Sequence, residues 1–148
     1  MKVCSEKNLT EMNRILSHKD VWEGTIDDNC NEDIRYKQAE QLLNGFISLM
    51  PNDDCLFVFR PLNSILLEGH MNVHPDGRGK TAIEAGKETL SWLFENTKFR
   101  KIIGLTPTYN KAAIRFAILI GMEREGVISN SWLKNGVLYD QVVTGINK

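Results

Sequence analysis

Apolar residues recur at helical spacing in two stretches of the first half of the chain. The first stretch, residues 8–17, places four apolar side chains near one helical face: Leu9, Met12, Ile15 and Leu16. A similar spacing in residues 32–46 predicts a second helix. The segment between them, VWEGTIDDNCNED, is acidic and has no regular period. It is interpreted as a connection, either solvated or facing a substrate.

The second half alternates between short apolar runs and helical patterns. The pattern predicts a turn at residues 51–54, a hairpin of strands at 55–59 and 64–73, a helix at 81–95, a strand at 101–105, a helix at 110–120 that Gly121 ends, and strands at 122–128 and 137–144. Asn135-Gly136 between the last two strands is a strong hairpin signal.

The order of these elements predicts the fold class. Two helices come first, then two strands, and then helix, strand, helix and two strands. Such an order predicts an α+β protein with one central mixed, mostly antiparallel sheet flanked by about four helices. Because 148 residues suit one domain of ordinary size, residues 1–148 are expected to form a single domain.

Charge and cysteine content narrow the functional classes. The 18 basic and 19 acidic residues leave a net charge of -1, so no general attraction to nucleic acid is expected. The three cysteines are widely spaced and, with the three histidines, form no metal-binding pattern, so reduced thiols in a cytoplasm and no metal are expected. The charged N-terminal segment resembles neither a signal peptide nor a membrane span, and no membrane partner is expected.

Gly79-Lys80-Thr81 raises the question of a nucleotide-binding P-loop. The first glycine of a P-loop, G-x-x-x-x-G-K-[ST], would fall at residue 74, which is His74. Histidine does not readily replace the glycine that permits the sharp turn. The later strand KIIGLT also carries no acidic residue for magnesium, so the P-loop interpretation is disfavoured.

A second way of holding a phosphate suits the same segment. A strand ends near Val73, a loop with Gly77 and Gly79 follows, and a helix begins near Thr81. Free N–H groups in the first turn of a helix bind anions, and Arg78 adds positive charge. An ordinary strand–turn–helix connection explains this segment equally well when it is taken alone.

Two segments together resemble the GCN5-related N-acetyltransferase (GNAT) family. MNVHPDGRGK is similar to the fourth strand and pyrophosphate loop of that family. Asn110, Ala113 and the Gly121-Met122 pair match the motif that follows. The string RGKTAIEAGKETLSWLFENTKFRKIIGLTP is also similar to small GNAT-like proteins from the head-assembly regions of tailed bacteriophages.

The resemblance implies a GNAT-like domain that binds acetyl-CoA as a co-substrate. It places cofactor contacts at Met71, Val73, Arg78, Gly79, Lys80, Thr81, Ala82 and Asn110. Two departures weaken this expectation. Thr81 and Ile83 stand where the family loop has glycine or a small residue, and Ala117 stands where many members have the tyrosine that protonates the leaving thiolate.

Residues 64–74 supply candidates for the base that takes a proton from an acceptor amine. Alternation along a strand puts Glu68, His70, Asn72 and His74 on one face. Glu68 is the first candidate because family enzymes often use a glutamate on this strand, and His70 is the second. The alternative is that these groups are hydrogen-bonded structural residues. Trp22, with acidic residues nearby, either lines an acceptor site or anchors a loop.

The sequence therefore predicts an acetyl-CoA-dependent N-acetyltransferase acting on a primary amine of a protein or small molecule. The alternative is a non-catalytic GNAT-fold bacteriophage head-assembly protein that acts through contacts with phage structural proteins. A CoA-binding regulatory module is a third alternative. Enzymatic activity is left open, a homodimer is one assembly to test, and a cytoplasmic location is expected, in the host cell if a phage encodes the chain.

Overall fold

Seven strands form one sheet, flanked by five α-helices. The structure, a computed structural model, describes all 148 residues. Its elements are β1 (Lys2–Val3), η1 (Glu6–Asn8), α1 (Leu9–Leu16), α2 (Lys19–Thr25), η2 (Glu32–Ile34), α3 (Gln38–Gln41), β2 (Ile47–Asn52), β3 (Cys55–Pro61), β4 (Leu66–Val73), η3 (Pro75–Gly77), α4 (Lys80–Asn96), β5 (Lys101–Pro107), α5 (Lys111–Leu119), β6 (Glu123–Lys134) and β7 (Val137–Asn147). None of the helices has the length and apolarity that a membrane span requires.

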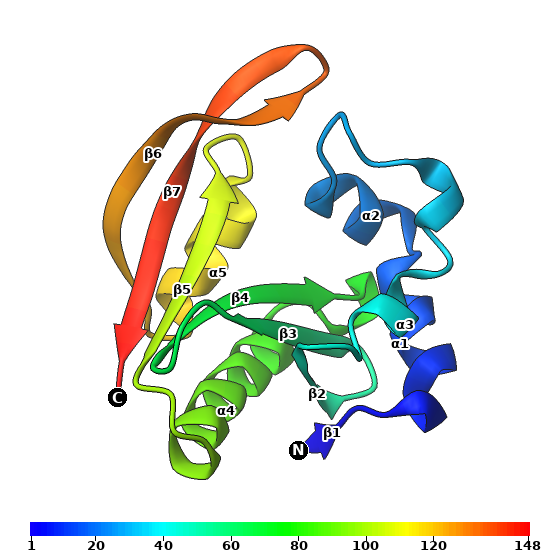
Figure 1. The fold of residues 1–148 in the computed structure, drawn as a ribbon, viewed down its shortest axis with the longest axis vertical. Helices are drawn as coiled ribbons and strands as arrows, with labels where there is room; N and C mark the ends of the chain where they lie inside the picture. The colour runs from blue at the N-terminus through cyan, green and yellow to red at the C-terminus, as the bar shows by residue number, and fades with distance from the viewer.

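The strand order is β1-β2-β3-β4-β5-β7-β6, and only β4 and β5 run parallel to each other. Figure 1 shows α4 on one side of the sheet and α1 and α3 on the other. Both faces are therefore covered, and the predicted class, an α+β fold with a mixed, mostly antiparallel sheet, is confirmed.

Two apolar clusters hold the helices to the sheet. On one face, α4 packs Ala85, Leu90 and Leu93 against β3 and β4, and Ala117 of α5 joins the same cluster. On the other face, the predicted stripe of α1 packs against β2 and β3 through Met12, Ile15 and Leu16. The alternation of β3 explains the two clusters, because Phe57 and Phe59 face α4 while Leu56 and Val58 face α1.

The elements from β3 onward match the sequence prediction closely. The β6–β7 hairpin turns at Asn135-Gly136, whose φ values of 52° and 72° are those of a two-residue turn with both central residues left-handed. Gly121 has φ 106° directly after α5, as expected for a residue that ends a helix. Strand β6 is longer than predicted and extends to Lys134.

The predicted helix over residues 32–46 is wrong. The segment contains only η2, the four-residue α3 and turns. Bonds to other parts of the chain compete with helix formation, since the Arg35 side chain donates to the Ser17 carbonyl and the Ala39 N–H donates to the Asn13 side chain. Gly45, at φ 79°, then turns the chain into β2.

Three further elements differ from the prediction. The irregular segment after residue 20 begins with α2, and strands β1 and β2 were not predicted. Pro51 suggested a turn, but it lies within β2, where the register with β3 shifts between Leu49 and Asn52. Proline has no N–H to donate to the ladder. A strand tolerates it where the register is irregular, because the ladder is already interrupted there.

Candidate functional site

Strands β4 and β5 separate after a short paired segment. Their register joins Leu66 to Lys101, Leu67 to Ile102 and Glu68 to Ile103, whereas β4 continues to Val73 and β5 to Pro107. Figure 1 shows the two strands diverging from that point. We call the region between the unpaired halves of β4 and β5 the splay.

The splay exposes backbone hydrogen-bonding groups of β4. The His74 N–H donates to the Asp54 carbonyl and the Leu62 N–H to the Leu66 carbonyl, so even-numbered residues of β4 bond to β3. By alternation, the N–H and C=O groups of Met71 and Val73 point toward the splay, where no strand pairs with them. Unpaired strand edges bind extended ligands through such groups.

The loop after β4 ends in a helix start with free N–H groups. Gly79 is the N-cap of α4 and has φ 88°, a conformation that favours glycine. No side chain caps this helix, and the N–H groups of Gly79, Lys80, Thr81 and Ala82 donate to no backbone carbonyl. Four unpaired N–H groups and the positive end of a 17-residue helix form a suitable place for a phosphate.

The two basic residues of this loop, Arg78 and Lys80, have different surroundings. The Arg78 guanidinium lies 3.7 Å from the Asp20 carboxylate of α2, and both side chains are half exposed. The Lys80 ammonium extends into solvent and pairs with Glu84 one turn along α4. Ile83 packs against the core cluster, so its side chain is directed into the protein rather than over the loop.

Glu68 lies at the centre of a charged cluster that starts at the splay. Its carboxylate accepts from Arg60 of β3, through Nε at 3.1 Å and also through Nη2, and it lies 3.5 Å from the His70 ring nitrogen Nε2. The Glu68 side chain is only 7% exposed. This contact confirms that Glu68 and His70 share one face of β4, as alternation predicted.

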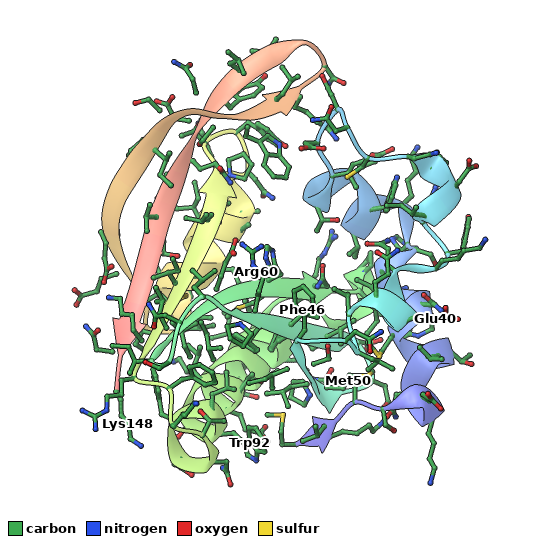
Figure 2. The ribbon with its side chains drawn as sticks, in the orientation of Figure 1. Glu40, Phe46, Met50, Arg60, Trp92 and Lys148 are labelled. Atoms are coloured by element: carbon green, nitrogen blue, oxygen red, sulfur yellow. The ribbon has the colours of Figure 1, made fainter.

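Arg60 was not predicted as a site residue. It lies directly opposite Glu68 in the β3–β4 hairpin, and Figure 2 shows its side chain pointing away from β3 toward the region between β5 and α2. Opposite charges at facing positions of a hairpin could have identified the pair, but the predicted strand stopped at residue 59. The arginine neutralises the buried carboxylate, and Glu68 is therefore held as an ion-paired carboxylate.

The His70 side chain is accessible to solvent and has a shifted pKa. Its side chain is about half exposed, yet enough protein surrounds it that desolvation lowers its pKa below the ordinary value of 6.5, which outweighs the attraction of Glu68. Arg60 lowers the pKa of His70 further. The imidazole is therefore neutral at pH 7 and able to accept a proton.

The other two residues of the predicted polar row make structural bonds. The buried Asn72 side chain donates to the Leu56 carbonyl of β3 at 3.3 Å. His74 lies just beyond β4 and accepts from the Asp76 N–H at 3.4 Å, which caps η3. Its ring also contacts His18, with the two centroids 4.7 Å apart.

Asn110 lies at the end of β5, across the splay from the loop after β4. Its side-chain oxygen accepts from the Ala113 N–H at 3.2 Å and so caps α5. Ala117 is buried in the core cluster and offers no acidic proton. Nearby, the Tyr109 hydroxyl accepts from the Trp132 indole N–H at 3.0 Å, and desolvation raises the pKa of Tyr109.

Trp22 anchors the N-terminal helices. Its side chain is buried, and its indole N–H donates to Glu32 at 2.9 Å. Between the two predicted alternatives, the structure supports the loop anchor. The acidic residues near Trp22 therefore need an explanation separate from that of the tryptophan.

The fold with this strand order and single parallel pair is shared with solved GNAT-family acetyltransferases. The structure superposes with a TM-score of 0.77 on a GNAT-family acetyltransferase from Bacillus anthracis, at 20% identity, covering 99% of this chain and 92% of the other. The TM-score is 0.78 for the spermidine N-acetyltransferase of Vibrio cholerae in complex with CoA and spermine, at 15% identity and coverages of 99% and 93%. For a Salmonella typhimurium protein with its cofactor acetyl-CoA it is 0.69, at 17% identity and coverages of 99% and 91%.

Within this fold, the chain belongs to the family described as protein of unknown function (DUF2824), whose profile matches residues 3–144. No curated protein matches the sequence. At these low identities the solved structures establish the GNAT fold, and the chemistry has to be argued from the site itself.

Proposed function

We propose that this protein binds acetyl-CoA in the splay and transfers the acetyl group to a primary amine. The observation that carries the proposal is the separation of β4 and β5 directly beside the free N–H groups of residues 79–82. The edge of β4 offers backbone hydrogen-bonding groups to an extended ligand, and the start of α4 offers N–H donors to phosphates. Two of the solved structures with this fold contain CoA or acetyl-CoA.

The proposed cofactor contacts follow from the sequence expectation and the geometry. Met71 and Val73 would bond the amide-containing arm of the cofactor through their backbone groups. The N–H groups of Gly79, Lys80, Thr81 and Ala82, with the Arg78 side chain, would hold the phosphates. The Asn110 side-chain oxygen already caps α5, so its proposed contribution to the cofactor is limited to the side-chain NH2, which the cap leaves free.

The proposed chemistry needs orientation, a hydrogen-bond donor and a base. Acetyl-CoA supplies the activated acetyl group: the amine nitrogen bonds to the acetyl carbon, the C–S bond breaks, and CoA leaves as a thiolate that takes its proton from water, since Ala117 offers none. The Val73 N–H is a candidate donor to the carbonyl oxygen as negative charge develops there. His70, neutral at pH 7, accepts the proton that the attacking amine loses, while Glu68 orients the ring and stabilises its protonated form. Glu68 is then a positioning residue, because Arg60 occupies its carboxylate.

Thermal unfolding with and without acetyl-CoA tests cofactor binding. A ligand at 100 times its dissociation constant stabilises a protein by about 2.7 kcal/mol, which raises the midpoint by roughly 2–4 °C per kcal/mol. Gly79→Glu should abolish the rise. Gly45→Glu is the matched control, because Gly45 has a similar φ of 79° with open space around it but lies outside the splay. No shift at millimolar ligand would contradict the proposal.

Turnover is tested separately with a panel of primary amines. His70→Ala should abolish acetylation while acetyl-CoA still raises the unfolding midpoint. Glu68→Gln should lower kcat and shift the pH profile, since the imidazolium loses its carboxylate partner. Unchanged rates in His70→Ala would remove His70 as the base.

A second candidate function is a non-catalytic protein that acts through contacts with other proteins. The buried Ala117 at the acid position and the neutralised Glu68 favour it. A bacteriophage head-assembly role is the form that the sequence suggests. Stable complexes with purified head proteins in size-exclusion chromatography, together with no amine acetylation, would support this function. The three free thiols suit a reducing cytoplasm under either function.

A further inference from the structure

An apolar cavity lies between the second half of α4, the end of α5 and the end of β7. It has a volume of about 380 Å³. Buried Leu90 and Ile120 line it together with half-buried Phe94 and Ile146. We call this cavity the α4–β7 groove. Its volume is within the range of roughly 300–1,000 Å³ that is usual for ligand sites.

A second cavity, of about 420 Å³, adjoins the groove at the end of α4. Its lining has no apolar residue and consists of Thr97, Lys98, Arg100 and Lys148. We call it the basic pocket. Lys148 also lines the groove, so the two cavities are neighbours. Figure 1 shows this end of the chain beside the start of β5, on the far side of the molecule from α2, and Figure 2 labels Lys148 there.

The cations of the basic pocket have no carboxylate partner. Lys98, Arg100 and Lys148 are exposed, and none of them belongs to an ion pair of the structure. The Lys148 ammonium donates one of its three protons to the Phe94 carbonyl. A concave surface lined by one sign of charge attracts the opposite sign, so the pocket suits an anionic group.

The groove has a matching charge at its other end. Lys87 lines it about two turns of α4 before Phe94, roughly 10 Å along the helix, and also has no ion-pair partner. The one carboxylate in the lining, that of Glu95, accepts from the Ser91 hydroxyl at 2.7 Å. Positive charge therefore flanks an apolar cavity on both sides.

This combination favours one kind of ligand. A nucleic acid or a free phosphate would use the basic pocket and leave the apolar groove empty, and the net charge of -1 gives nucleic acid no wider attraction. A peptide that carries an apolar side chain between acidic residues would use both cavities. Apolar anchors in a pocket with charges at the rim are the usual anatomy of protein interfaces.

We propose that the α4–β7 groove and the basic pocket together bind an acidic peptide segment of a partner protein. The segment places an apolar side chain over Leu90 and Ile120 and its carboxylates against Lys98, Arg100 and Lys148. The site lies at the opposite end of α4 from residues 79–82, about 25 Å away along this 17-residue helix. It is therefore independent of the acetyl-CoA site proposed above.

Selection from a library of short random peptides identifies the preferred ligand without a known partner. We expect the selected peptides to combine several acidic residues with a large apolar one. Their affinities are then measured by fluorescence anisotropy with fluorescein-labelled synthetic peptides. A selection that enriches no peptide, or that enriches peptides without net negative charge, would overturn the proposal.

Charge reversal tests the basic pocket. Lys98→Glu combined with Arg100→Glu should weaken binding of the selected peptide about tenfold or more, and added salt should weaken its binding to the unmodified protein. Lys7→Glu combined with Lys37→Glu is the matched control, because these exposed lysines lie outside both cavities and the change in net charge is the same. Equal losses in the two double variants would mean that only net charge matters, which contradicts a site.

Filling the groove tests the apolar contact. Ser91 is an exposed residue of the lining, so Ser91→Trp should cover the groove without disturbing the core and weaken peptide binding about tenfold. Ser91→Ala is the control, since it loses the bond to Glu95 but fills nothing. Pyrophosphate and a single-stranded oligonucleotide are tested as competitors. If either binds as tightly as the peptide, and Ser91→Trp changes nothing, the pocket is a phosphate site and the proposal is wrong.

Acetyl-CoA separates this site from the proposed function. The Lys98→Glu/Arg100→Glu variant should keep the rise in unfolding midpoint that acetyl-CoA produces. If the peptide binds but acetyl-CoA has no effect on the unmodified protein, the proposed function fails while the peptide site stands. If acetyl-CoA raises the midpoint and no acidic peptide is selected, only the peptide site fails.

Discussion

The region from β4 to α5 and the region of residues 18–46 follow the same rules of local structure but were predicted with very different success. In the first region, helix starts, helix ends and strand bounds fall within a few residues of the prediction. In the second, a predicted helix is replaced by short turns, and a helix occupies the supposed irregular segment. The difference lies in where each region finds its hydrogen-bond partners.

The β4–α5 region is held by regular ladders and by an apolar face. Its helix α4 buries Ala82, Ala85, Leu90 and Leu93 along one stripe, which the sequence displays directly. Residues 18–46 depend instead on side chains that bond distant backbone groups, such as Arg35 to Ser17 and Asp28 to the hairpin tip. The periodicity of apolar residues can be read from the sequence, but a hydrogen-bond partner far away in the chain cannot.

Overpacking at Gly86 should have the largest effect on stability. A Cβ at this position would lie 2.6 Å from Cγ2 of Ile120, where α4 meets the end of α5. Gly86→Val should lower the free energy of unfolding by about 1–3 kcal/mol. Chemical denaturation measures it, with Gly126→Ala as the control because nothing lies within 4 Å of its added Cβ. An unchanged midpoint in Gly86→Val would mean that the two helices are not in close contact.

Thiol reactivity should separate residues 18–46 from the rest of the chain by about a hundredfold. Burial raises the pKa of Cys4 and of Cys55 to about 11 from the ordinary value of 9.0, so at pH 8 their thiolate fraction falls by roughly that factor. Cys30, in the loop between α2 and η2, is exposed. Iodoacetamide followed by peptide mass spectrometry should modify Cys30 first. Equal rates for all three would contradict the burial of Cys55 in β3.

Removing the indole donor should affect the N-terminal helices alone. Trp22→Phe keeps a ring in the pocket but loses the bond to Glu32, at a cost of about 1 kcal/mol. Hydrogen exchange should rise in residues 18–46 and stay unchanged in α4. A rise of equal size in both regions would show that they unfold together. The two regions would then differ in how well their sequences predict structure but not in stability.

Acid should weaken the hydrogen bonds between Asp28 and the tip of the β6–β7 hairpin, and this effect should be the smallest. The N–H groups of Gly136 and Asn135 lower the pKa of Asp28 below its ordinary value of 3.8. The stabilisation is therefore fully present above that value and is lost as the pH falls through the lower pKa of the folded protein. The protection factor of the Gly136 N–H against hydrogen exchange, measured between pH 5 and the acid limit of folding, should fall only below about pH 4. In Asp28→Asn this pH dependence should disappear.

The candidate site divides in the same way as the fold. Gly79 and Asn110 were predicted from local motifs that resemble a known family, and the structure shows that each starts a helix, Gly79 as a left-handed N-cap and Asn110 as a side-chain cap. Gly121 was predicted as a helix end and has that place. The roles of Arg60 and Asp28 were missed because both depend on partners distant in the chain, Glu68 for Arg60 and the hairpin tip for Asp28. The assignment of His70 ahead of Glu68 as the base also needed the distances that only the fold supplies.

By itself, the sequence determined the α+β class, the helical stripes, the glycine-bearing loop before α4 and the hairpin turn at Asn135-Gly136. These features depend on periodicity and on backbone conformations that few residues adopt, and both are local properties. Only the tertiary structure decided where β4 and β5 part, which cation neutralises Glu68, and that Asp28 bonds to the tip of the β6–β7 hairpin. Those outcomes depend on pairs of groups far apart in the chain, which become neighbours only after the sheet has formed.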